Sequence, residues 1–146
     1  MQNVMQRPLL EFTDEHDTLA LWDAPRELAA FGTDGYTYNL NADHAAGRIA
    51  AATRAAKLIL LTDVRGVYRD LRDESSYLPE LTAAQAQDLI DSGAAERGMI
   101  PKLQSCLDAL VNGVERAHII DGRVPHAVLM EILTDSGIGT MFVKDQ

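Results

Sequence analysis

Three kinds of side chain suited to phosphate chemistry stand where the sequence predicts that strands end and helices begin. Asn39 and Asp43 flank the start of one helix, Asp63 follows a strand, and Lys102 lies at the start of another helix. Phosphoryl transfer needs charge neutralisation and orientation more than covalent participation by the protein. Lys102 would attract the transferring oxygens, Asp43 would orient cationic groups or Mg²⁺, and Asn39 would hold the acceptor. Phosphoryl transfer is therefore the first hypothesis for this chain.

Lys102 lies in the first turn of the helix predicted within "RGMIPKLQSCLDALVNG", residues 97–113. Pro101 in the first turn and Gly113 after the last apolar residue are typical of helix ends. Apolar residues with the spacing of one buried face follow at Leu103, Cys106, Leu107, Leu110 and Val111. A cation near a helix N-terminus is unfavourable unless an anion shares the site. Lys102 therefore either points into water or helps to bind an anion such as phosphate.

The other polar residues each have a simpler alternative interpretation. Asn41 or Asp43 could be no more than the N-cap of a helix. Asp63 could be a turn residue that hydrogen-bonds its own backbone. His118 and His126 have no cysteine or carboxylate at the spacing of metal ligands, so we expect no metal site.

Composition limits the function classes further. The chain has 146 residues and 47% hydrophobic residues, enough for one compact domain. Its formal net charge of −9 argues against nucleic acid or an anionic membrane as a partner. The absence of a membrane-length apolar stretch and of a secretion signal predicts a cytoplasmic protein. The single cysteine, Cys106, excludes an internal disulfide, and its place on the apolar face predicts a buried, inert thiol.

Strand-like and helix-like segments alternate from residue 36 onward. The predicted strands are 36–40, 57–62, 117–121 and 139–143, and the predicted helices are 42–55, 82–93, 101–111 and 124–133. Thr82 and Gln85 have the spacing of a capping box at the start of one helix. Such alternation predicts an α/β three-layer sandwich with a mainly parallel sheet covered on both faces. Ligands of such sheets bind beyond the carboxyl ends of the strands.

Two segments do not fit this alternation. Residues 63–80 form a long predicted loop, and long loops in compact domains are often lids or binding loops. Residues 18–31 have the weak periodicity of a helix interrupted by Pro25.

Four blocks of the sequence carry a family resemblance. In order, they are "GTDGYTYNLNADHAAGRIAAA", "KLILLTDVRGVYRD", "GMIPKLQSCLDAL" and "HIIDGRVPHAVLMEILTDSGIGTM". Together they cover residues 32–143 and resemble the C-terminal half of the N-acetyl-L-glutamate kinases, members of the amino acid kinase family. The resemblance implies a transferase of arginine biosynthesis. Its substrates would be ATP, with Mg²⁺ bound through the nucleotide, and N-acetyl-L-glutamate, and its product N-acetyl-L-glutamyl 5-phosphate.

The resemblance also implies roles for particular residues. Asn39 would contact acetylglutamate, Asp43 would organise the catalytic lysines, and Lys102 would stabilise the transferring phosphoryl group. The nucleotide site would be lined by Asp63, Val64, Gly66, Val67, Tyr68, Ala94, Ala95 and Glu96. The C-terminal block resembles that of members inhibited by L-arginine, in which the positions of His118, Glu131 and Gly137 belong to the effector site.

The sequence also departs from the family. These kinases are about twice as long, and their N-terminal half supplies a second catalytic lysine, glycine-rich loops and an arginine for the substrate carboxylate. Where the family has a buried strand ending in proline, this sequence has "APRELAAFG". We therefore expect residues 1–31 to be an unassigned segment and residues 32–146 to be the nucleotide-binding lobe, as in a fragment, a split gene or a misread start. Such a chain would have little activity alone, and a missing N-terminal lobe or a homo-oligomer would be its partner.

Two other classes of function remain as alternatives. The chain could be a non-catalytic module that binds arginine or a nucleotide and complements another polypeptide. It could also be a receiver-like domain with Asp63 as phosphoacceptor, but the acidic pair and the late lysine that such a domain needs are not evident.

Overall fold

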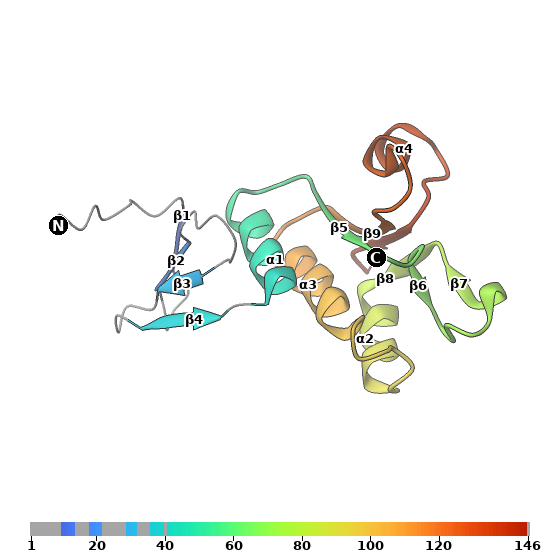
Figure 1. The fold of residues 1–146 in the computed structure, drawn as a ribbon, viewed down its shortest axis with the longest axis horizontal. Coiled ribbons are helices and arrows are strands. Elements are labelled where there is room, and N and C mark those ends of the chain that lie inside the picture. The colour runs from blue at the N-terminus through green and yellow to red at the C-terminus, as the bar shows by residue number, and fades with distance from the viewer. Residues whose placement is uncertain (1–9, 14–17, 22–28, 32–35, 40, 146) are drawn as a thin grey trace. The chain divides into compact units, whose positions relative to one another are not determined.

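The computed structural model describes residues 10–13, 18–21, 29–31, 36–39 and 41–145. It divides the chain into two compact units, Met1–Ala42 and Asp43–Gln146. Each unit is described by itself below, with elements labelled as in Figure 1. The expected boundary between residues 31 and 32 remains a prediction.

The first unit contains a four-stranded antiparallel sheet in the order β1-β2-β3-β4. Its strands are β1 (Leu10–Thr13), β2 (Thr18–Leu21), β3 (Ala29–Phe31) and β4 (Thr37–Asn39). The strand expected at 36–40 is confirmed, but the helix expected over 18–31 is wrong in its described part. Ala20 pairs with Phe31 and Leu21 with Ala30, so these backbones bond across a sheet, and strand pairing overrides the weak helical periodicity.

The second unit is built on a four-stranded sheet in the order β5-β9-β10-β8. Its strands are β5 (Lys57–Thr62), β8 (Glu80–Thr82), β9 (Arg116–Asp121) and β10 (Thr140–Val143). β5 and β9 are parallel, as are β8 and β10, whereas β9 and β10 are antiparallel. The predicted α/β class with a mostly parallel sheet is confirmed. The short strand β8 was not predicted.

Four helices accompany this sheet: α1 (Ala42–Ala52), α2 (Ala83–Asp91), α3 (Ile100–Val111) and α4 (Ala127–Leu133). The capping box of α2 is confirmed, since the Thr82 hydroxyl accepts from the Gln85 amide and the Gln85 side chain accepts from the Thr82 amide. The expected start of α4 near residue 124 is wrong. His126 is in the left-handed region with φ 59°, so Pro125 precedes the helix.

The helices cover the sheet on two sides. α2 and α3 lie on one side and α4 on the other, which gives the expected three layers (Figure 1). The core between α3 and the sheet includes Leu103, Leu110, Ile119 and Phe142, all essentially inaccessible to solvent. Val111, expected on the buried face of α3, is instead 81% exposed at the last residue of the helix.

The segment predicted as a long loop, 63–80, is folded into a ribbon. β6 (Val67–Tyr68) and β7 (Tyr77–Leu78) pair antiparallel, with a 3-10 turn at Glu74–Ser76 between them. The Thr140 hydroxyl ties the ribbon to β10, because it accepts from the Val67 amide at 2.8 Å and donates to the Leu78 carbonyl at 2.6 Å. The role of this ribbon as a lid or binding loop remains a prediction.

Within the described part of the chain, the helices are too short or too polar to cross a lipid bilayer.

Candidate functional site

Lys102 and Asp43 form an ion pair between the first turns of α3 and α1. The ammonium Nζ lies 2.9 Å from Oδ1 and 3.0 Å from Oδ2 of the carboxylate. The side chains are 20% and 21% exposed, so the pair is partly shielded but reachable from solvent. The interpretation in which Lys102 simply points into water is therefore wrong, and the sequence-predicted lysine and carboxylate are brought together.

The surroundings of this pair are closely packed. The Ser105 hydroxyl donates to the backbone carbonyl of Asp43. Gly47 of α1 faces Ser105 of α3 so closely that a Cβ atom there would lie 2.7 Å from the Ser105 Oγ. Burial, and after it the charge of Asp43, raises the pKa of the Cys106 thiol well above its usual range. The expected burial of Cys106 is confirmed, and a thiol that stays protonated is a poor nucleophile.

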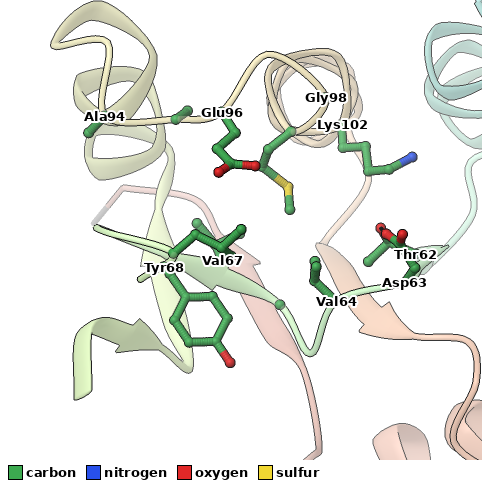
Figure 2. Close-up of a pocket in the computed structure, with 13 residues that line it drawn as sticks. Thr62, Asp63, Val64, Val67, Tyr68, Ala94, Glu96, Gly98 and Lys102 are labelled. Atoms are coloured by element: carbon green, nitrogen blue, oxygen red, sulfur yellow. Dashed lines mark hydrogen bonds between the residues drawn. The ribbon is translucent and has the colours of Figure 1, made fainter. Parts of the chain in front are cut away.

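A cleft of about 180 Å³ opens beside Lys102. Figure 2 shows residues of β5, β6 and their connection on one side and the segment that leads into α3 on the other. All eight predicted nucleotide-site residues line it, together with Lys102. The lining residues that the sequence analysis did not single out are Thr62, Leu71, Gly98 and Met99. Gly98 and Met99 lie in the quoted block "GMIPK", so the motif itself could have identified them.

The cleft combines an apolar side with a charged one. Val64, Val67, Met99 and the Tyr68 ring supply apolar surface, whereas Lys102 supplies a cation and Asp63 and Glu96 supply carboxylates. The apolar surface suits a flat apolar group of a ligand, and the Lys102 ammonium suits an anionic group. Pockets that enclose a small molecule typically measure about 300–1,000 Å³. The cleft in this unit is smaller, so by itself it would enclose only part of a nucleotide.

A second ion pair, not predicted from the sequence, lies at the same edge of the sheet. Arg123 donates from Nε and Nη2 to the two carboxylate oxygens of Asp121 at 2.9 and 2.8 Å. The Gly122 amide donates to the Thr62 carbonyl at 2.8 Å, which holds this turn beside the end of β5. The Arg123 side chain, followed by its backbone amide, lowers the pKa of Asp121 to about 2.

The three residues predicted as effector positions also come together. His118 Nδ1 lies 2.7 Å from the Oε1 atom of Glu131, and a Cβ on Gly137 would lie 2.9 Å from Oε2. The second carboxylate oxygen accepts from the amides of Ile138 at 2.6 Å and Gly139 at 3.0 Å. Both side chains of the pair are almost fully buried.

Hydrogen bonding dominates the ionisation of Glu131. Burial would raise its pKa, but the bonds from Ile138, His118 and Gly139 together outweigh burial and lower the pKa. The Nε2 atom of His118 is buried and has no hydrogen-bond partner within the described part of the chain.

Two expectations from the sequence concern Asn39 and metal binding. Asn39 is the last residue of β4, in the first unit, and its contact with an acceptor remains a prediction. The residues that the structure describes contain no group of three or more His, Cys, Asp or Glu side chains that could hold a metal ion.

Comparison with known proteins identifies the class. Residues 26–121 match the amino acid kinase family. This match covers more than half of the chain, and the chain therefore belongs to the amino acid kinase family.

The chain is also similar to individual acetylglutamate kinases. It is 56% identical over 116 residues to the acetylglutamate kinase of Caldanaerobacter subterraneus subsp. tengcongensis, an alignment that covers 80% of this chain and 39% of that enzyme. It is 58% identical over 113 residues to the acetylglutamate kinase of Symbiobacterium thermophilum, an alignment that covers 77% of this chain and 39% of that enzyme. The chain thus spans about two fifths of the length of these curated relatives.

Solved structures agree on the fold. An N-acetylglutamate synthase from Neisseria gonorrhoeae, complexed with coenzyme A and N-acetylglutamate, superposes with a TM-score of 0.71 at 30% identity over 81% of this chain and 27% of that one. A carbamate kinase from Giardia lamblia bound to AMP-PNP gives a TM-score of 0.63 at 14% identity, over 95% of this chain and 59% of that one. At that identity, the second likeness supports the fold alone.

Proposed function

We propose that this chain supplies the nucleotide-binding half of an acetylglutamate kinase. The reaction would convert ATP and N-acetyl-L-glutamate into ADP and N-acetyl-L-glutamyl 5-phosphate. The observation that carries this proposal is the Lys102–Asp43 pair, which borders a cleft lined by all eight positions expected to contact the nucleotide. The identity to named acetylglutamate kinases supports the choice of acceptor.

The residues that line the cleft would suit parts of a nucleotide. Bound ATP would supply the phosphoryl group, with Mg²⁺ held through its phosphates. Lys102 would direct its ammonium at the transferring oxygens and stabilise the charge that they carry. Asp43 would fix that ammonium at the edge of the cleft. The apolar surface around Val67 and Tyr68 would receive the base.

The activity of residues 1–146 by themselves is expected to be very low. The resemblance places a second lysine, glycine-rich loops and the arginine for the substrate carboxylate in sequence that these residues do not match. Removing part of a set of catalytic groups that act together leaves much less than a proportional share of the rate. We expect weak MgATP binding and negligible acyl phosphate formation from this polypeptide. Robust turnover would contradict this part of the proposal.

Calorimetric titration with MgATP tests the site. Lys102→Ala should bind at least about tenfold more weakly than the unmodified chain, because a charge-assisted hydrogen bond contributes about 1.5–3 kcal/mol. Lys144→Ala is the matched control, since Lys144 is an exposed lysine outside the cleft. Equal affinity of Lys102→Ala and the unmodified chain would exclude Lys102 from phosphate binding. No binding by the unmodified chain would overturn the proposal.

A second candidate is a non-catalytic module that binds L-arginine. The adjacency of His118, Glu131 and Gly137 favours it, as does the 32% identity and TM-score of 0.68 to an N-acetylglutamate synthase from Neisseria gonorrhoeae complexed with coenzyme A and L-arginine. An arginine guanidinium would have to displace groups that already bind the Glu131 carboxylate. Heat on titration with L-arginine but none with MgATP would favour this module.

The cytoplasmic location and a homo-oligomeric state remain predictions.

A further inference from the structure

The helices α1 and α3 meet at two successive levels. The Lys102–Asp43 ion pair forms the first level, and the close approach of Gly47 to Ser105 forms the second. Residues three or four apart share one face of a helix, so each helix contributes one residue to each level from the same face. A Cβ on Gly47 would lie 2.7 Å from the Ser105 Oγ and 2.9 Å from the Ser105 carbonyl oxygen. The second level therefore sets the distance between the helices.

Ser105 connects the two levels. Its side chain is fully buried, and its hydroxyl donates to the backbone carbonyl of Asp43. A serine inside a helix commonly bonds a carbonyl one turn back in its own helix. Ser105 instead reaches the neighbouring helix, at the residue whose carboxylate binds Lys102.

We propose that Ser105 is a positioning residue for the Lys102–Asp43 pair. Asp43 lies in the first turn of α1, where helices fray because the backbone amides of that turn lack acceptors within the helix. The bond from Ser105 anchors this turn to α3, one turn beyond Lys102. The anchor keeps the carboxylate facing the ammonium and thereby keeps the ammonium at the edge of the cleft. The importance of this position for phosphoryl transfer rests on the proposed function, whereas the positioning itself does not.

The lysine ammonium signals in NMR spectra test the positioning directly. The chain has three lysines, Lys57, Lys102 and Lys144, so the signals can be assigned by substitution. Hydrogen exchange at the Lys102 ammonium should be slow in the unmodified chain and fast in Asp43→Ala, which removes both acceptor oxygens and so defines complete loss of the pair. Ser105→Ala, which removes only the hydroxyl, should accelerate exchange at least threefold. Ser105→Cys, with a similar size but a weak donor, should lie between these limits.

A control separates positioning from stability. Val114 is fully buried and follows Lys102 by twelve residues, so Val114→Ala should lower the free energy of unfolding without changing Lys102 exchange. If Ser105→Ala and Ser105→Cys leave Lys102 exchange unchanged, or change it no more than Val114→Ala does, the positioning role is wrong. MgATP titration of the same variants gives a separate readout. An unmodified chain that shows slow Lys102 exchange but no MgATP binding would overturn the proposed function and leave the positioning intact.

Discussion

Two hydrogen-bonded side-chain pairs of similar length stand in opposite environments. Lys102 and Asp43 lie 2.9 Å apart with side chains 20% and 21% exposed, whereas His118 and Glu131 lie 2.7 Å apart with 4% and 3% exposed. The first pair borders a cleft and joins two helices. The second joins β9 to α4 and, through backbone amides, to the turn before β10.

This difference in exposure means that the Lys102 ammonium is accessible to a ligand, whereas the Glu131 carboxylate is bound by groups inside the protein. Glu131 is bonded by an imidazole and two amides, so its carboxylate is satisfied without solvent. The Lys102 ammonium has three N–H donors, and both oxygens of the Asp43 carboxylate accept from it. A partly exposed ammonium at a cleft can bind a phosphate without dismantling the core. Breaking each pair should therefore have very different consequences.

Removing the buried carboxylate should have the largest effect on stability. Glu131→Ala leaves the buried His118, the buried Gly139 amide and the partly buried Ile138 amide without their acceptor. Each donor left without its acceptor costs about 1–3 kcal/mol. Denaturant unfolding should therefore show a loss of roughly 3 kcal/mol or more for the three donors. A loss below about 1 kcal/mol would place this pair with ordinary surface pairs and remove the contrast.

The same pair predicts a dependence on pH. Because folding lowers the pKa of Glu131 from its usual 4.5, its contribution to stability is present above that value and is lost as pH falls through the lower folded pKa. Glu131→Gln, which cannot ionise, should show a shallower loss of stability in this acidic range. Equal slopes for the two proteins would show that other carboxylates govern acid unfolding.

An added methyl group at Gly66 should have the next largest effect. A Cβ there would lie 2.5 Å from the Thr140 Oγ1, the atom that holds the ribbon to β10. Overpacking of this kind costs about 1–3 kcal/mol, so Gly66→Ala should lower the free energy of unfolding by that amount and also weaken MgATP binding. Gly98→Ala is the matched control, because Gly98 also lines the cleft but has open space around its Cβ position. Similar losses in both variants would refute the steric explanation.

The sequence predicted local features better than long-range ones. The strand 57–62 and the capping box at Thr82 were confirmed because each depends on a run of neighbouring residues. The ribbon within 63–80 and the strand β8 were missed because a hydroxyl from Thr140 and pairing with β10 stabilise them, and both lie about 60 or more residues further along the chain.

The candidate site shows the same limit. Lys102 stood out because a lysine in a first helical turn is electrostatically unusual, and family resemblance supplied the lining positions. Ser105 and Gly47 gave no comparable signal, since their importance depends on how closely two helices approach. A serine on the same helical face as Lys102 and a glycine inside a helix were the hints available.

Neutralising Asp43 should affect stability less than either change above. Asp43→Asn keeps the size of the side chain and removes a partly exposed charge partner, so a loss of about 1 kcal/mol or less is expected. MgATP affinity should fall more than stability does, because the Lys102 ammonium is no longer held at the cleft. Thermal unfolding and calorimetry on the same samples measure both quantities. A stability loss as large as that of Glu131→Ala would make the two pairs equivalent and refute the contrast.

The Asp121–Arg123 pair, in which the Arg123 side chain is 68% exposed and that of Asp121 15%, should have the smallest effect on stability. Arg123→Gln should raise the pKa of Asp121 from about 2 toward 3.8 in a carboxyl ¹³C NMR titration, and by linkage it should lower stability at neutral pH only to the extent that this pKa rises. The rise should be incomplete, because the variant keeps the backbone amide that donates to Asp121 at 2.9 Å. Arg116→Gln, at the opposite end of β9, should leave the Asp121 titration unchanged. If the pKa of Asp121 stays at about 2 in Arg123→Gln, the backbone amide rather than the guanidinium is what stabilises its charge.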